Sequence, residues 1–118
     1  DAPCSGLGTV RRHPEIKWRL DASRLGGLAR RQRQLLSSAV ATLEPGGVVL
    51  YVTCSTEPEE NDAVIDAVMR SCPDVRAQPL EGASLAAAIG DDGYFRTYPG
   101  EPQLDGFFAA LLRREPRG

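Results

Sequence analysis

Two cysteines and an aspartate are the residues of this 118-residue chain whose types and surroundings favour chemistry. Cys54 directly follows Val48 to Thr53 (VVLYVT), a β-branched and aromatic run typical of a strand buried on both faces. Cys4 lies in the segment Asp1 to Gly8 (DAPCSGLG), which has the composition of a loop leaving a neighbouring strand. Loops that leave adjacent strands of an open α/β sheet share its ligand crevice. We therefore expect both thiols and the Asp1 carboxylate to meet at one edge of a sheet.

Such a set of groups suits methyl transfer to carbon 5 of a cytosine, which is a poor nucleophile. A thiolate that adds to carbon 6 makes the ring enamine-like, so that carbon 5 can attack an electrophilic methyl group. We expect Cys54 to supply the thiolate, favoured by the dipole of a helix beginning near Thr56. Asp1 would hydrogen-bond the base edge and help to protonate the ring. Cys4 would assist removal of the carbon 5 proton.

Each of these residues also has a purely structural interpretation. A cysteine after a strand is more often a small buried hydrophobic side chain than a nucleophile. Asp1 is compatible with a turn residue. His13, the single histidine, precedes a proline in a basic loop and is compatible with a solvated role. Cys72 has no motif around it and is expected to pack.

The composition is that of a globular chain and argues against several kinds of site. Apolar residues make up 42% and charged residues 25%, which is the ordinary range. No apolar run approaches the ~20 residues of a membrane-spanning helix, and the first residues do not resemble a signal peptide. The three cysteines form no CxxC pair, whereas a structural zinc site needs about four closely spaced ligands. We expect no metal, and free thiols in a reducing, cytoplasmic compartment.

The net charge of −2 hides an asymmetry along the chain. Eight basic and two acidic residues lie from Arg11 to Arg33, whereas six basic and thirteen acidic residues lie from Gln34 to Gly118. A basic stretch on an acidic body can bring a polyanion to one face of the molecule. A solvated, salt-bridged helix face would have the same composition.

The rest of the sequence predicts the elements that position the cysteines. Residues at three- and four-residue spacing on one face, mostly apolar and including Gln32, Leu35 and Leu36, predict a helix over 24–43, which Glu44-Pro45-Gly46-Gly47 ends. A second helix is predicted over 57–71, with a capping box formed by Thr56 and Glu59. Shorter elements are expected as a strand at 75–80, a helical turn at 84–89, an extended piece at 94–98 and a final strand at 106–113.

This order of elements predicts an α/β fold with the two helices on opposite faces of a mostly parallel sheet, in three αβα layers. A doubly wound sheet usually needs about five strands or more, and fewer are visible here, so we expect a partial sheet. The strand at 48–53 would then be an unprotected edge, which favours self-association of the chain.

Four ordered motifs resemble the Sun/Fmu family of RNA cytosine-5 methyltransferases. Residues 1–8 look like its proline–cysteine motif, and residues 51–61 (YVTCSTEPEEN) resemble its threonine–cysteine motif with a trailing Glu-Asn. Residues 105–109 (DGFFA) resemble its C-terminal strand signature. Residues 11–18 (RRHPEIKW) are similar to a segment typical of the bacterial small-subunit ribosomal RNA branch. The resemblance covers nearly the whole chain.

The resemblance implies a Rossmann-like class I methyltransferase fold, of which residues 1–118 would form the C-terminal part. It also implies S-adenosylmethionine as methyl donor, bordered by Asp1 and Pro3, and a target base flipped out of its stack. Cys54 would be the nucleophile, and Cys4 would assist release from the methylated RNA. The family's cofactor loop and N-terminal RNA-binding domain would precede Asp1, so the chain alone is expected to be inactive. The resemblance implies 16S ribosomal RNA as the substrate, and contacts with its phosphates are expected from Arg11, Arg12, His13, Lys17, Arg30 and Arg31.

Three other interpretations stay open at this point. A methyltransferase acting on an exocyclic amine would carry an acidic–proline–proline–aromatic loop at residues 1–4 and needs no second cysteine. A non-catalytic RNA-binding or assembly module with a methyltransferase-like fold would bind RNA regardless of Cys54. A thiol redox protein would be expected to carry a CxxC motif.

Overall fold

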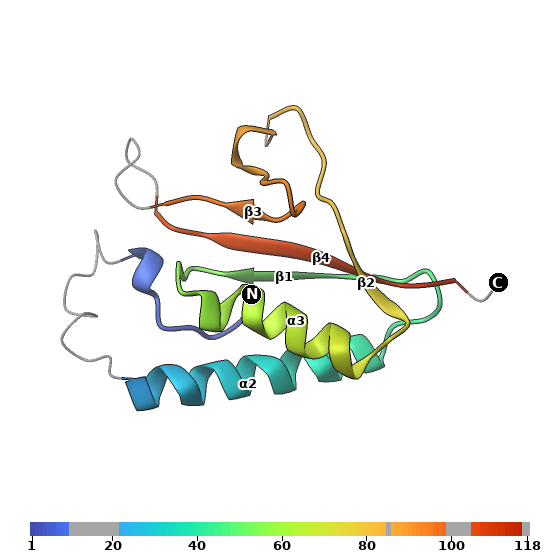
Figure 1. Ribbon diagram of the computed structural model, residues 1–118, viewed down its shortest axis with the longest axis horizontal. Helices are drawn as coiled ribbons and strands as arrows, with labels where there is room; N and C mark the ends of the chain where they lie inside the picture. The colour runs from blue at the N-terminus through green and yellow to red at the C-terminus, as the bar shows by residue number, and fades with distance from the viewer. Residues whose placement is uncertain (10–21, 85, 99–104, 117–118) are drawn as a thin grey trace.

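The computed structural model describes residues 1–9, 22–84, 86–98 and 105–116 (Figure 1). Two α-helices and the strands of one sheet make up most of this described part. The elements in chain order are η1 (Leu7–Thr9), α2 (Ala22–Ala41), β1 (Val48–Thr53), η2 (Pro58–Glu60), α3 (Asp62–Ser71), β2 (Val75–Gln78), η3 (Ala86–Ala88), β3 (Phe95–Arg96) and β4 (Phe108–Arg114), where η denotes a 3-10 turn.

The last strand, β4, organises the sheet. It lies between β1 and β2, and it pairs with both of them and with β3 in antiparallel fashion. The prediction of a mostly parallel sheet is therefore wrong for the described residues. β1 and β2 do run in the same direction, but β4 returns between them and takes the hydrogen bonds that they would have shared.

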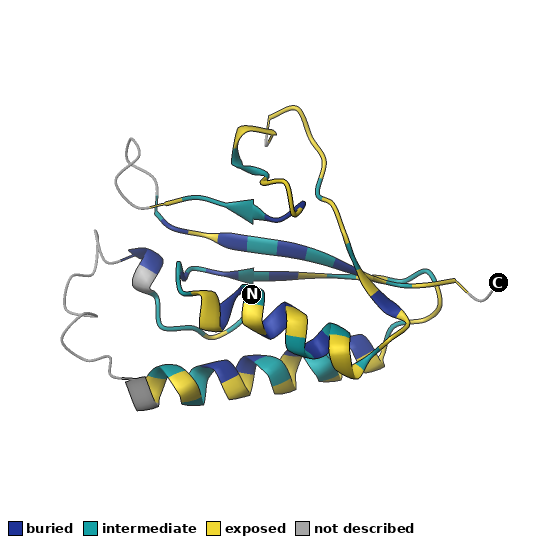
Figure 2. Cartoon of the chain, in the orientation of Figure 1, coloured by how far each residue is buried: buried dark blue, intermediate teal, exposed yellow. Residues whose placement is uncertain are grey.

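Both helices pack on one face of this sheet. Phe108, Ala110 and Leu112 are buried and alternate along β4 with less buried residues, so they share one face of the strand (Figure 2). The core that they form also contains Val40 of α2 and Ile65 of α3. Figure 1 shows α2 and α3 running together along one side of the strands. The described residues thus build two layers of the expected three.

The path of the chain explains why the prediction of helices on opposite faces is wrong. The Ala2 N–H donates to the Val52 carbonyl at 2.9 Å, so the first residues lie beside β1. From there the chain passes through α2 to β1, and through α3 to β2, always moving across the sheet in the same direction. Right-handed crossovers in one direction place their helices on the same face.

The other face of β1 is open. Val48 and Leu50 are each 50% exposed, whereas Tyr51 on the helix-covered face is 5% exposed. In the register of the sheet, Leu50 lies opposite Leu111 of β4. The prediction that this strand is buried on both faces is therefore wrong for the described residues. The open face is nevertheless apolar.

Element boundaries follow the predictions at most positions. The strands at the middle and end of the chain are confirmed as β1, β2 and β4, and the short pieces as η3 and β3. The predicted capping box is not confirmed. The 3-10 turn η2 comes first, α3 begins only at Asp62, and neither element has a side-chain cap.

No helix in the described ranges is long and apolar enough to cross a membrane.

Candidate catalytic site

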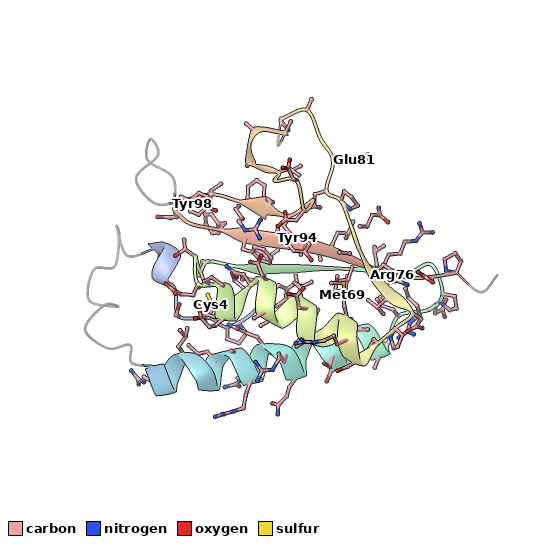
Figure 3. The ribbon with its side chains drawn as sticks, viewed as in Figure 1. Cys4, Met69, Arg76, Glu81, Tyr94 and Tyr98 are labelled. Carbon is pink, nitrogen blue, oxygen red and sulfur yellow. The ribbon has the colours of Figure 1, made fainter. Side chains whose placement is uncertain are left out.

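The two cysteines that the sequence predicted to meet lie in contact. The Sγ atoms of Cys4 and Cys54 are 3.1 Å apart, a distance at which one thiol can donate to the other. Cys54 follows the carboxyl end of β1, and Cys4 lies near that end on the segment beside it (Figure 3). Their predicted proximity is confirmed, whereas their catalytic roles stay predictions.

A third segment joins the two cysteine loops. The Gly8 N–H donates to the Cys54 carbonyl at 2.9 Å, and the Gly106 N–H donates to the Gly8 carbonyl at 2.7 Å. A Cβ atom on Gly8 would lie 1.9 Å from the Gly106 oxygen, so this approach requires glycine. The proline–cysteine, threonine–cysteine and C-terminal motifs therefore converge at one place in the fold.

The environment of Cys54 holds its thiol protonated. Burial raises its pKa to about 12, and the hydrogen bond and charge of Cys4 act in the same direction, as does the charge of Glu60. The prediction that a helix dipole favours the thiolate is wrong for this arrangement. The cause is the late start of α3 at Asp62 rather than near Thr56.

The side chain of Glu60 lies beneath both cysteine loops and is fully buried. Its carboxylate accepts hydrogen bonds from Ser5, Ser55 and Gln32. Sequence reasoning placed Glu60 in a motif but assigned it no task. Gln32 was detectable as a polar residue within the apolar stripe of the predicted helix.

The loop between Cys54 and α3 is fixed by a second set of hydrogen bonds. The Asn61 side chain accepts from the Thr53 hydroxyl at 2.6 Å and donates to the Ser55 carbonyl at 2.8 Å. The Tyr51 hydroxyl donates to the Glu60 carbonyl at 2.7 Å. Asn61 is the N-cap residue of α3, and its bonds to Thr53 and Ser55 use its side chain in place of a cap.

A cavity of about 310 Å³ opens beside the Cys54 loop. Arg96 in its wall forms ion pairs with Asp62 and Asp92 and lies over the rings of Tyr94 and Phe108. Since its charge is shared between two carboxylates, Arg96 is held in place. The cavity is lined by Ser55, Thr56, Pro58, Asn61, Asp62, Arg96, Thr97 and Tyr98.

The remaining predicted site residues that the structure describes are exposed. Asp1 and Pro3 are exposed, and the Pro3 carbonyl accepts from Gln32 at 2.8 Å. Arg30 and Arg31 are exposed on α2. Within the described ranges, no cluster of three or more His, Cys, Asp or Glu side chains could hold a metal ion. Four further predicted RNA-contacting residues lie outside the described residues, namely Arg11, Arg12, His13 and Lys17.

Comparison with known sequences shows what this chain is similar to. A family model described as 16S rRNA methyltransferase RsmB/F matches residues 1–113. Ribosomal RNA small subunit methyltransferase B is 44% identical over 112 residues in Xanthomonas campestris and 39% identical over 114 residues in Pasteurella multocida. These alignments cover 95% and 97% of this chain but 25% of each relative. The chain therefore spans about a quarter of the length of these curated relatives.

Solved structures show the same arrangement of elements. NSun6 from Pyrococcus horikoshii, solved with SFG, matches with a TM-score of 0.80 and 30% identity, over 99% of this chain and 29% of that chain. A methyltransferase homolog protein from the same organism matches with a TM-score of 0.73 and 31% identity, over 97% of this chain and 37% of that chain. The predicted α/β, Rossmann-like methyltransferase fold with a partial sheet is thereby confirmed.

Proposed function

The chain belongs to the RsmB/F family of 16S rRNA methyltransferases, and on that premise we propose that it forms the C-terminal part of an enzyme that methylates carbon 5 of a cytosine in ribosomal RNA. The observation that carries the proposal is the contact of Cys4 and Cys54 at 3.1 Å, at the carboxyl end of β1. Ligand sites of open α/β sheets lie at that end of the strands. A paired thiol there suits covalent catalysis.

In the proposed reaction Cys54 first loses its proton, and its sulfur adds to carbon 6 of the base. The electron pair of the π bond between carbons 5 and 6 is thereby made available at carbon 5. Carbon 5 takes the methyl group, while the bond between the methyl carbon and the sulfur of its donor breaks and leaves its electrons on that sulfur. A base then removes the proton from carbon 5. The electrons of the bond between carbon 5 and this hydrogen restore the double bond between carbons 5 and 6, and Cys54 leaves as a thiolate. Cys4 is the group that we assign to this release step, because its sulfur is the nearest to that of Cys54.

S-adenosylmethionine is the methyl donor that we propose. The relative from Pyrococcus horikoshii was solved with SFG, an analogue of this cofactor. Asp1 and Pro3 are the residues of this chain that fit one wall of such a site. They precede Cys4 on the segment beside β1, and the Asp1 side chain is exposed and available to a hydroxyl group of a ligand or to the base edge.

We assign RNA phosphate contacts to the basic stretch of the chain. Arg30 and Arg31 are exposed on α2, and phosphate contacts position a nucleic acid without reading its sequence. The same role is proposed for Arg11, Arg12, His13 and Lys17. An enzyme of ribosomal RNA is expected in the cytoplasm, which also suits the free cysteines Cys4, Cys54 and Cys72.

Trapping of the covalent intermediate tests the proposed role of each cysteine. The intact protein carrying Cys4→Ala is mixed with ribosomal RNA and S-adenosylmethionine and run on a denaturing gel. We expect an RNA-linked protein band that disappears when Cys54→Ala is added, because the adduct forms but is not released. Cys72→Ala is the matched control and should form no stable band.

Two outcomes would overturn the assignment. Unimpaired carbon 5 methylation by the Cys54→Ala protein would remove Cys54 as nucleophile. Salt-dependent RNA binding without any methylation by the wild-type protein would instead support a non-catalytic RNA-binding or assembly module.

A further inference from the structure

The carboxylate of Glu60 has no role in the reaction proposed above, yet it is fully buried beside the reacting cysteines. Two of its hydrogen-bond partners are serines that each directly follow one of these cysteines in the sequence. Ser5 directly follows Cys4, and Ser55 directly follows Cys54. Both serines donate to this one carboxylate, although they are 50 residues apart in the chain.

The individual contacts show how the two carboxylate oxygens are divided. Oε1 accepts from the Ser5 backbone N–H at 2.6 Å and from Gln32 Nε2 at 3.2 Å. Oε2 accepts from the Ser5 hydroxyl at 2.6 Å and from the Ser55 hydroxyl. Gln32 Nε2 also donates to the carbonyl of Pro3, the residue before Cys4, at 2.8 Å.

We propose that Glu60 is a positioning residue whose carboxylate bridges the Cys4 and Cys54 loops and sets the separation of the two sulfurs. A buried carboxylate is costly unless its oxygens are satisfied, and here donors from both loops and from α2 satisfy them. Movement of either loop would leave part of this charge unpaired. The two loops are therefore held to one another through Glu60 rather than each to the sheet alone.

The backbone that carries Glu60 is itself held by further hydrogen bonds. Its own backbone carbonyl accepts from the buried Tyr51 hydroxyl, and the neighbouring Asn61 bonds to Thr53 and Ser55. Reach matters here as much as charge. An aspartate keeps the charge but withdraws the carboxylate by one methylene, whereas a glutamine keeps the reach but removes the charge.

The consequence for catalysis rests on the proposed function, but the positioning itself does not. Since a small misplacement of reacting groups costs rate rather than binding, Glu60→Asp should lower kcat for methyl transfer by about tenfold or more. The KM for RNA should stay unchanged, because Glu60 is buried and does not reach the solvent-exposed basic residues.

Disulfide formation between Cys4 and Cys54 tests the positioning without RNA or cofactor. The intact protein is treated with diamide, which takes two electrons and two protons from the two thiols as the S–S bond forms. The cross-linked peptides are followed by mass spectrometry over time. The variants are Glu60→Asp, Glu60→Gln and, as matched control, Glu59→Gln at the exposed neighbouring position.

We expect Glu60→Asp to slow the disulfide roughly tenfold, because loss of buried hydrogen bonds frees the loops. The Glu60→Gln protein should form the disulfide faster than the Glu60→Asp protein, since its amide still reaches both loops. The Glu59→Gln protein should form it at the wild-type rate. A folded Glu60→Asp protein that reacts at the wild-type rate would overturn the proposal. If that variant does not fold, Ser5→Ala and Ser55→Ala replace it, and wild-type rates in both would overturn the proposal.

The two assays separate the possible failures. If Cys54 is not the nucleophile, the RNA-linked band is absent but the disulfide rates still depend on Glu60. If Glu60 does not position the loops, the disulfide rates are equal while the RNA-linked band persists.

Discussion

At the scale of single residues, the contact between the two sulfurs raises a question about access. A separation of 3.1 Å leaves no room for a pyrimidine ring between Cys4 and Cys54. If the base enters between them in the proposed reaction, the two thiol side chains rotate apart before Cys54 reaches carbon 6, while Glu60 keeps the loops that carry them in place. Separation removes the hydrogen bond and the charge of Cys4, two of the causes that raise the pKa of Cys54. Entry of the base and activation of the nucleophile would then be one event.

Substitution of Cys4 should remove the same hydrogen bond and charge from Cys54 without any RNA. We expect Cys4→Ala to lower the pKa of Cys54 below its value of about 12. Burial, the largest cause, persists, so the pKa should stay above the ordinary value of 9.0. Since the thiolate is the reactive form, alkylation of Cys54 by iodoacetamide should become faster at mildly alkaline pH, about tenfold for each unit by which the pKa falls. The measurement is the pH dependence of Cys54 labelling by mass spectrometry.

Internal controls make this measurement specific. Labelling of Cys72, which lies at the end of α3, should be the same in both proteins. Cys4→Ser keeps a hydroxyl that can hydrogen-bond and should give an intermediate profile. Identical Cys54 profiles in the wild type and Cys4→Ala would show that Cys4 does not control this thiol.

Among the secondary-structure elements, α2 shows that apolar periodicity predicted the helix correctly but did not predict which of its residues are buried. The predicted apolar stripe includes both Leu35 and Leu36. In the structure Leu36 is 3% exposed and Leu35 is 47% exposed. Two consecutive helical positions are about 100° apart around the axis, so a stripe that includes both is wider than the surface that α3 and the sheet cover.

These neighbouring leucines form a matched pair for a stability test. Leu36→Ala should lower the free energy of unfolding by about 2–5 kcal/mol, because it leaves a cavity in the core. Leu35→Ala should change it by less than about 0.5 kcal/mol, because it alters a half-exposed position. Chemical denaturation of each variant provides the comparison. Equal losses at both positions would contradict the orientation of α2.

The start of α3 illustrates a competition between local and tertiary hydrogen bonds. Thr56 and Glu59 have the spacing of a capping box, yet no side-chain cap forms at η2 or α3. Asn61, at the start of α3, instead bonds to Thr53 and Ser55. A cap contributes about 1 kcal/mol, and two bonds made in a buried site contribute at least as much.

Taken as a whole, the described part of the molecule leaves one apolar face of β1 uncovered. Val48 and Leu50 are half exposed on an apolar surface that includes Leu111 and Ala109 in the register of the sheet. Contiguous apolar surface of this kind marks a place where something else packs. The chain spans about a quarter of the length of its curated relatives, and we propose that residues of the intact protein outside this chain cover this face.

Substitution of Leu50 by lysine tests that proposal. In the isolated chain Leu50→Lys should have little effect on the melting temperature, because the position is half exposed there. In the intact protein it should be strongly destabilising, since the charge would be buried without a partner. Leu35→Lys on α2 is the control and should have a similar, small effect in both. A small effect of Leu50→Lys in the intact protein would indicate that the face stays open.

Self-association through the edge of β1 is a separate prediction and remains one. That edge carries one hydrogen bond from Ala2 to Val52 in the structure. The rest of the edge is available in the described residues for pairing with another strand, which is a general hazard of exposed edges.

Local patterns in the sequence were enough to predict the secondary-structure elements and to identify the reactive groups. Apolar periodicity located α2, α3, β1, β2 and β4, because burial of one helix face or of a strand leaves its mark within a short window. The residues around Cys4 and Cys54 indicated the family, since the chemistry requires particular side chains beside one another in the chain. Placement of both cysteines after predicted strands was enough to predict that they meet.

The directions of the strands and the side on which the helices pack depend on contacts that form only when the chain folds. Strand direction and helix side depend on β4, which comes last and inserts between β1 and β2, and no local pattern records that order. The raised pKa of Cys54 depends on burial and on Cys4, which is distant in the chain. Glu60 was invisible as a bridge because its partners, Ser5 and Ser55, come together only when the loops fold against it. Long-range contacts of this kind have no periodicity, so they appear only once the chain is folded.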